Sequence, residues 1–290
     1  VLTADIIDSS TSTCINISAN NVTFDGNGHL VDGNDVATVG IYLFRSSQQF
    51  TNVTIKNVNV SDWDLANIFL ERANNNTIEN SKSYSSESIS SILLWDRSDY
   101  NYLNNITLIN NDEGIQFRLS HYNIINNSNL SYNSDIGLSV DRAEGNIILN
   151  TEIKENQDFD IYFSFDQDTY CNNWVFTNVT GSGNNPIEFY NTQSVIENKT
   201  LSTLIICSAS NSIINNVSIV GSSIYNNNYM HLFASSNLNV TNINSSNNEI
   251  GIFNSGLINS HLHNLTIKNN DQYGLEFLEC YNNTLINSII

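Results

Sequence analysis

Short stretches in which apolar and polar residues alternate recur along the whole chain. The segment 68–81, IFLERANNNTIENS, shows the pattern: an alternating apolar stretch, an arginine, a run of asparagines and a second apolar stretch. Alternation over a few positions is the period of a β-strand, and no region has the i, i+3, i+4, i+7 spacing of a helix. Ile and Val, which suit a pleated surface packed on a neighbour, fill most apolar positions. The pattern predicts short strands joined by asparagine-rich turns.

These predicted strands fall into two interleaved series. The first reads GIYLF, NIFLE, SILLW, GIQFR, IGLSV, DIYFS, PIEFY, TLIIC, YMHLF, GIFNS and GLEFL, starting at Gly40, Asn67, Ser91, Gly114, Ile136, Asp160, Pro186, Thr203, Tyr229, Gly251 and Gly274. The second includes NVTIKN from Asn52, NTIEN from Asn76, NITLINN from Asn105 and NLTIKNN from Asn264. The interval is mostly about 21 to 27 residues, within the range of stacked-repeat proteins.

The repeat predicts an all-β solenoid, a parallel β-helix of about 11 coils. At roughly 4.8 Å between strands, the coils would make a rod on the order of 50 Å long. Leucine-rich repeats have a similar period and also carry an asparagine ladder, so they are the competing architecture. They need Leu at several fixed positions and a helical segment in each repeat, whereas this chain favours Ile and has polar, helix-poor intervals. We therefore expect the β-helix.

Composition and charge narrow the function further. Asparagine accounts for 53 residues, and it is the non-glycine residue that best tolerates left-handed turns, so many tight corners are expected. The formal net charge of −19 repels nucleic-acid phosphates and anionic membranes, which argues against both as partners. No apolar run approaches the roughly 18 residues of a membrane span, so direct membrane insertion is not expected.

We predict one β-helix domain over residues 1–290, with an N-terminal cap and first coil in residues 1–33. Solenoids need caps because an open terminal rung exposes unpaired strand edges and apolar core. The sequence ends within a repeat, at NNTLINSII, which predicts an uncapped C-terminal end. Further domains of a longer protein, or other copies of this chain, are the partners expected to stack there.

The four cysteines, Cys14, Cys171, Cys207 and Cys280, form no CxxC pair, and with five scattered histidines they offer no zinc site. Cys171 and Cys207 both fall in predicted turns beside adjacent strands. They are the best-placed pair for a disulfide, and a chain without any disulfide is the alternative.

The opening STCINISANNVTFDGNGHLVDG at 12–33, followed by NNTIEN and GIYL phrases, resembles the NosD-like family of right-handed parallel β-helix repeats. The segment 196–223 resembles the archaeal cell-surface members in particular. The resemblance implies a right-handed β-helix at an extracellular location. This chain has Asp25, Gly26 and Asn27 where relatives often have aspartate, cysteine and asparagine, so Cys14 lacks a local partner. One methionine, Met230, and dispersed histidines do not supply a copper cluster, and no copper is expected.

All five arginines follow a first-series strand in five consecutive repeats, which predicts a column on one edge of the rod: Arg45, Arg72, Arg97, Arg118 and Arg142. Acids accompany this column within a few residues: Glu71, Asp96, Asp99, Asp141 and Glu144. The column forms either a ladder of surface ion pairs, worth about 0–1 kcal/mol each, or a strip that binds carboxylates of an acidic glycan or a partner subunit. Beyond the fifth repeat the edge has no arginine and becomes acidic or neutral, with Asp166, Asp168, Glu188 and Glu276.

Parallel β-helices include polysaccharide lyases and hydrolases, so we tested the acids for catalytic arrangements. A glycoside hydrolase needs two facing carboxylates about 5–9.5 Å apart, but most acids here stand beside an arginine or alone. A lyase needs an acidic calcium cluster beside a basic residue, which Asp96, Arg97 and Asp99 could imitate. The arrangement favours a protein without catalytic activity.

Two further kinds of site have structural alternatives. Asp25, Asp32 and Asp35 in DGNGHLVDGND supply oxygen ligands for Ca²⁺, the one cofactor considered, although the same glycine-rich residues suit a turn in the cap. N-x-S/T sequons mark candidate glycosylation sites, although the repeat itself generates them, and they include Asn52, Asn75, Asn105, Asn216 and Asn264.

Taken together, these features predict a non-catalytic, extracellular structural or adhesive protein, a subunit or segment of a cell-surface layer or filament. The alternative is a module that binds acidic polysaccharide, or a polysaccharide lyase or hydrolase.

Overall fold

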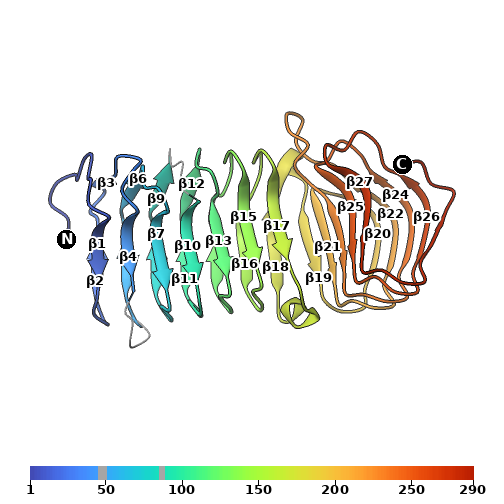
Figure 1. Ribbon diagram of the computed structural model, residues 1–290, viewed down its shortest axis with the longest axis horizontal. Helices are drawn as coiled ribbons and strands as arrows, with labels where there is room; N and C mark the ends of the chain where they lie inside the picture. Colours follow the sequence, from blue (N-terminus) through green and yellow to red (C-terminus); the bar gives the residue numbers. More distant parts are fainter. Residues whose placement is uncertain (45–50, 85–88) are drawn as a thin grey trace.

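The computed structural model describes residues 1–44, 51–84 and 89–290, and it contains two successive stacks of parallel strands in an elongated molecule (Figure 1). The first stack has three sheets. Sheet 1 comprises β1 (Thr13–Ile17), β4 (Val39–Leu43), β7 (Ala66–Glu71), β10 (Ser90–Trp95), β13 (Ile115–Arg118), β15 (Ile136–Asp141) and β17 (Phe159–Ser164). Sheet 2 comprises β2 (Thr23–Asp25), β5 (Thr54–Lys56), β8 (Thr77–Glu79), β11 (Tyr102–Asn104), β14 (Ile124–Asn126), β16 (Ile147–Glu152) and β18 (Val175–Thr180). Sheet 3 comprises β3 (Leu30–Asp32), β6 (Asn59–Ser61), β9 (Lys82–Tyr84) and β12 (Thr107–Ile109).

The second stack has two sheets. Sheet 4 comprises β19 (Ile187–Tyr190), β21 (Thr203–Cys207), β23 (Met230–Phe233), β25 (Ile250–Ser255) and β27 (Tyr273–Leu278). Sheet 5 comprises β20 (Val195–Leu201), β22 (Ile213–Ile219), β24 (Asn239–Ser245), β26 (His261–Thr266) and β28 (Thr284–Ile286). Two short 3₁₀ helices, η1 (Asp168–Cys171) and η2 (Ser182–Asn184), lie where the first stack ends. No helix in the described part of the chain is long and apolar enough to cross a membrane.

The eleven first-series phrases correspond to the strands of sheets 1 and 4 from β4 to β27, and β1 adds one more strand at the N-terminal end. Neighbouring strands pair in parallel throughout, for example Ile41 with Ile68 and Ile68 with Ile92. These side chains point inward and are 1% exposed or less. Burying each such isoleucine contributes about 1.5–3 kcal/mol. The predicted all-β parallel solenoid of about 11 coils is confirmed.

Buried asparagines connect the rungs at the start of sheet 2. The Nδ2 atoms of Asn76, Asn101 and Asn123 each donate to the Oδ1 atom of the asparagine one rung along, over 3.0, 3.0 and 3.1 Å, and the ladder ends at Asn146. Each Oδ1 atom also accepts from the backbone N–H of the preceding asparagine. The ladder satisfies polar groups that would otherwise be costly to bury.

The stack is interrupted between β17 and β19, so the strands do not form one uninterrupted rod. Sheet 1 ends at β17, and sheet 4 begins separately at β19. The outward side chains of Ile187, Ile205, Cys207 and Phe233 belong to the core of the first stack. The outer face of the second stack therefore covers the open end of the first, and we call this contact the seam.

The first rung of the second stack carries its own polar cap. Glu188 and Tyr190 pair in register with the core residues Leu204 and Ile206, so they occupy inward positions at the end of that core. The Lys199 Nζ atom donates to both Glu188 carboxylate oxygens, at 2.7 and 2.8 Å, and to the Tyr190 hydroxyl at 3.1 Å. Polar side chains thus close a rung that has no strand beneath it.

Candidate functional site

The turns that follow sheets 1 and 4 form one edge of each stack, and we call these edges together the corner. Most of these turns have five residues, such as 72–76, 142–146 and 234–238, with left-handed backbone at the first and fourth positions. The left-handed pairs are Arg72 and Asn75, Leu119 and Tyr122, Arg142 and Gly145, Ser208 and Asn211, Ala234 and Asn237, Gly256 and Asn259, and Glu279 and Asn282. This shared geometry is why side chains from different repeats line up along one edge.

The described arginines all lie at the corner, but they do not share one position in the repeat. Arg118 is in register with Trp95 and Asp141 at the strand ends. Arg72 and Arg142 take the next position, where the backbone is left-handed, and Arg97 lies one residue further along its turn. The described arginines thus lie along one edge but at three successive positions, each one residue further along the repeat. Arg45 lies outside the described residues.

Three of these arginines pair with acids. The Nε atom of Arg72 lies 2.6 Å from Asp96 Oδ2 of the next rung, which raises the pKa of Arg72. Arg118 and Arg142 share Asp141, with Nε to carboxylate oxygen distances of 3.3 and 2.9 Å. Arg118 also lies over the Trp95 ring, 5.2 Å from its centroid. The corner of the first stack is therefore an ion-paired ladder.

The acids of the triplet Asp96, Arg97 and Asp99, which could have imitated a lyase-like cluster, have separate partners. Asp96 pairs with Arg72, and the Asp99 carboxylate accepts from the His121 backbone N–H at 2.7 Å. Burial raises the pKa of Asp99. Both acids are thus engaged in structural contacts within the corner.

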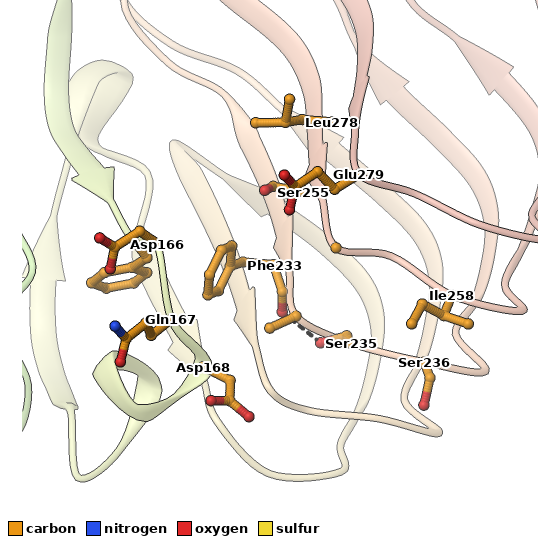
Figure 2. Close-up of a pocket in the computed structure, with 13 residues that line it drawn as sticks. Asp166, Gln167, Asp168, Phe233, Ser235, Ser236, Ser255, Ile258, Leu278 and Glu279 are labelled. Atoms are coloured by element: carbon orange, nitrogen blue, oxygen red, sulfur yellow. Dashed lines mark hydrogen bonds between the residues drawn. The ribbon is translucent and has the colours of Figure 1, made fainter.

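The corner changes shape at the seam. Ten residues, 165–174, separate β17 from β18 and include η1, so the chain projects outward at this turn. On the facing side, the turns of the second stack have small residues, Ala234 and Gly256, at their first left-handed positions. A groove of about 550 Å³ lies between the projecting residues 165–174 and the turns of the second stack that carry the small residues (Figure 2).

The groove has a mixed aromatic, hydroxyl and acidic lining. Figure 2 shows Asp166, Gln167 and Asp168 on the side of η1, and Glu279 on the opposite side. Phe233 lies between them. The lining is completed by Phe165, Ala234, Ser235, Ser236, Ser255, Gly256, Ile258 and Leu278. Aromatic rings, hydroxyls and carboxylates are groups that can stack on and hydrogen-bond to a sugar. No lysine, arginine or histidine belongs to this lining.

Sequence reasoning identified part of this groove. It marked Asp166 and Asp168 as an acidic continuation of the arginine edge, whereas Phe233 and Glu279 were not selected. The spacing of the turns could have placed these residues on the same edge. Ala234, Gly256 and Glu279 all directly follow a strand of sheet 4, at the same left-handed position, and Phe233 is the last residue of such a strand. Glu188 and Glu276 do not belong to the groove lining.

Two of the three aspartates of the candidate calcium site, Asp32 and Asp35, interact with the same neighbour, Asp62. Burial, together with these two neighbouring carboxylates, raises the pKa of Asp62 to about 6. Asp32 also accepts from the Ser61 hydroxyl, whereas Asp25 contacts Asn57 at 3.1 Å and Lys56 at 3.6 Å. Within residues 1–44, 51–84 and 89–290, no group of three or more His, Cys, Asp or Glu side chains is arranged to hold a metal ion.

The cysteines and the sequons have clear positions. Cys171 in η1 forms a disulfide with Cys207 in β21, with their Cα atoms 5.3 Å apart, and Cys14 and Cys280 are free thiols.

The five sequon asparagines are all exposed, and each has left-handed backbone: Asn52, Asn75, Asn105, Asn216 and Asn264. All five therefore lie on the outside of the coils, Asn216 within β22, Asn264 within β26 and the other three between strands.

A second acidic surface lies where the chain enters sheet 1, and sequence reasoning did not select it. Asp112, Asp135 and Asp158 occupy equivalent positions in three rungs, joined by backbone hydrogen bonds of 3.0 Å. Burial, followed by repulsion from the neighbouring acids, raises the pKa of Asp135 to about 6. The same two causes raise the pKa of Glu113 to about 7.

Comparison with known proteins supports the architecture. A model of the right-handed β-helix region matches residues 39–201, and no curated protein matches the sequence. The catalytic domain of a GH87 α-1,3-glucanase in complex with tetrasaccharides superposes with a TM-score of 0.52 at 16% identity, over 95% of this chain and 56% of that one. The chain thus spans little more than half of the glucanase structure.

Two other solved structures show lower similarity. The A-module of the mannuronan C-5 epimerase AlgE6 from Azotobacter vinelandii has a TM-score of 0.46 at 10% identity, over 93% of this chain and 83% of that one. The surface adhesin PfbA of Streptococcus pneumoniae has a TM-score of 0.41 at 9% identity, over 95% and 83%. Such likeness concerns the fold alone. Because the family model covers more than half of the sequence, this chain belongs to the family of right-handed β-helix proteins.

Proposed function

We propose that the chain is a non-catalytic, extracellular β-helix that serves as a structural and adhesive element of a microbial cell surface, of the archaeal NosD-like type. The observation that carries this proposal is the ion-paired corner. Arg72, Arg118 and Arg142 contact acids of their own or the next rung, so these charges are paired within the stack. An elongated molecule with paired charges along its edge suits a scaffold.

The groove gives this scaffold a place to bind a neutral glycan. Phe165 and Phe233 offer rings, and Ser235, Ser236 and Ser255 offer hydroxyls, within one cavity. An acidic polysaccharide fits less well, because the lining holds Asp166, Asp168 and Glu279 and no basic side chain. Adhesion through the groove therefore favours uncharged sugars over the acidic glycans considered from sequence.

Binding of neutral and acidic oligosaccharides to the full-length protein, with analysis of any products, tests this function. We expect retention of a neutral glycan without release of reducing ends or unsaturated sugars. Ser236→Trp, which fills the groove, should abolish binding, whereas Thr200→Trp on the exposed face of β20 should not. Equal binding of the glycan by both variants would mean that the glycan binds outside the groove.

A polysaccharide hydrolase is the second candidate. Asp166 and Asp168 lie on the opposite side of the groove from Glu279, as Figure 2 shows, and glycoside hydrolysis requires a pair of carboxylates that flank the bond to be cleaved. Product formation that disappears in both Asp168→Asn and Glu279→Gln would establish this activity in place of simple binding.

Assembly at the last rung forms part of the same proposal. Tyr273, Phe277, Leu285 and Ile289 are each more than two fifths exposed on or beside β27 and β28. We expect further coils of a longer protein, or another copy, to stack on this rung and bury these side chains. Negative-stain imaging over a range of concentrations should show filaments or sheets, and isolated short rods at every concentration would contradict assembly through copies.

Glycosylation of the exposed sequon asparagines would fit this extracellular setting. Mass spectrometry of peptides from the native protein would test occupancy at Asn52, Asn75, Asn105, Asn216 and Asn264.

A further inference from the structure

A histidine lies buried inside the seam between the two stacks. His231 is 1% exposed and points outward from β23, where it is in register with Ile205 of β21 and Phe253 of β25. Its ring stacks on Phe253 with centroids 4.7 Å apart, and the rings of Tyr229 and Phe233 lie 5.7 and 5.8 Å away. The surroundings of the imidazole are therefore aromatic.

Neither ring nitrogen of His231 has a hydrogen-bond partner among the described residues. A buried polar group without a partner is costly, and an apolar side chain would fill the same space without that cost. Ile205 and Phe253, the residues in register on either side, are apolar. Histidine at this position thus weakens the seam relative to the residue that the packing alone would favour.

The chain around His231 makes the contacts that join the stacks. The Tyr229 hydroxyl accepts from the backbone N–H of Phe163 in β17 at 3.1 Å. The Asn227 carbonyl accepts from the backbone N–H of Asp160 at 3.2 Å. Opening the seam would break these two hydrogen bonds and at the same time expose the imidazole of His231 to solvent.

The ionisable groups that face this region come from three elements. β17 contributes Asp160 and Tyr162, and the segment before β23 contributes Tyr229. β27 contributes Glu276, in register with Phe253. Asp160 is fully buried and accepts from Ser182 and Ser202, so it is satisfied without a cation. No salt bridge to His231 occurs among the described residues.

We propose that His231 makes the seam an acid-sensitive joint, because acidification favours the open form, in which the exposed imidazole keeps a proton, and that Asp160 opposes this response in the native protein. Burial lowers the pKa of His231 to about 3 in the closed seam, whereas an exposed histidine has a pKa of about 6.5. As far as His231 is concerned, the closed form therefore binds the proton less tightly than the open form. The contribution of His231 to the stability of the closed form is complete above about pH 6.5 and is lost progressively as the pH falls towards 3.

The Asp160 carboxylate responds in the opposite direction. Burial raises the pKa of Asp160 to about 7, so protonation on acidification favours its buried state. The Asp160→Asn variant removes this opposing response and isolates that of His231. The Cys171–Cys207 disulfide keeps the stacks tethered, so the joint loosens without separating them.

Hydrogen exchange of the oxidised full-length protein between pH 7 and pH 4.5, corrected for intrinsic exchange, tests the joint. In Asp160→Asn, we expect peptides covering Asp160 and Phe163 to lose protection below about pH 6.5, by about tenfold per pH unit. In the native protein the Asp160 carboxylate, with a pKa of about 7 when buried and about 3.9 when exposed, offsets this loss between pH 6.5 and pH 4.5, so protection should change little. In His231→Phe only Asp160 responds, so protection should rise on acidification, and His261→Asn, on exposed β26, should behave like the native protein.

Two results would overturn the proposal: a flat pH profile in Asp160→Asn, or the same pH profile in His231→Phe as in the native protein. His231→Leu provides a second apolar replacement should the phenylalanine not fit the seam. Peptides from β11, far from the seam, report whether acid unfolds the first stack as a whole.

Discussion

Cys171, in the 3₁₀ helix between the last two strands of the first stack, is covalently joined to Cys207, on the outer face of β21 in the second stack. Both side chains are fully buried, and the bond spans 36 residues of sequence. The disulfide therefore links the two stacks directly at the seam, next to the turn that forms one wall of the groove.

Removing this bond should destabilise the protein measurably. For a loop of this length, the chain-entropy model gives about 4 kcal/mol for Cys171→Ala together with Cys207→Ala. Denaturant unfolding under oxidising conditions measures the change, and Cys14→Ala, which removes a free thiol, provides the control. Equal stability of the double variant and the control would mean that the disulfide contributes nothing.

Breaking the buried asparagine ladder should cost more than removing an exposed amide. Asn101→Ala leaves the backbone N–H and the amide of Asn76 without their acceptor, a loss on the order of 3 kcal/mol. Asn104→Ala, in the adjacent strand, removes an acceptor from Asn126 and Asn127 that water can replace. Comparable losses in the two variants, measured by denaturant unfolding, would argue against a structural role for the ladder.

Two glycines in turns of the corner allow the cost of backbone strain to be measured apart from that of steric clash. Gly145 and Gly256 have φ values of 66° and 67°, so alanine at either costs about 1–2 kcal/mol. A Cβ atom at 145 would also lie 2.4 Å from the Tyr122 ring, whereas at 256 the nearest atom, in Ala234, is 3.5 Å away. Gly145→Ala should therefore lose a further 1–3 kcal/mol, roughly, in thermal or denaturant unfolding. Equal effects would show that the Tyr122 ring moves aside freely.

The stability of the protein should fall as the pH rises through the range in which the carboxyl groups of Asp135 and Glu113 ionise. The pKa of Asp135 is raised to about 6 and that of Glu113 to about 7, so the folded state binds these protons more tightly than the unfolded state. The resulting penalty is absent below about pH 4 and complete above about pH 7. Asp135→Asn should thus stabilise the protein at pH 8 and change little at pH 4, as measured by urea unfolding. A stabilisation of equal size at both values would exclude ionisation as its cause.

The repeating part of the fold was predictable because each coil carries its own complete signal. Ile68, Ile92 and Ile115 recur at matching positions in their phrases, and the structure stacks them in register. The acids Asp166 and Asp168 could likewise be placed on the corner edge, because they follow a strand of the same series. The groove as a whole could not be predicted, because Glu279 lies more than a hundred residues away in sequence and meets them only across the seam.

The sequence by itself determined the strand period, the inward Ile and Val positions and the asparagine corners, since these depend on neighbours within a coil and on identical neighbours above and below. Only the tertiary structure decided where the stack is interrupted, how the arginine positions shift relative to one another, and that His231 lies in a buried seam. Those features arise when surfaces of different repeats meet. The packing of one particular contact, and not the repeating pattern, fixes which side chains are buried or paired there.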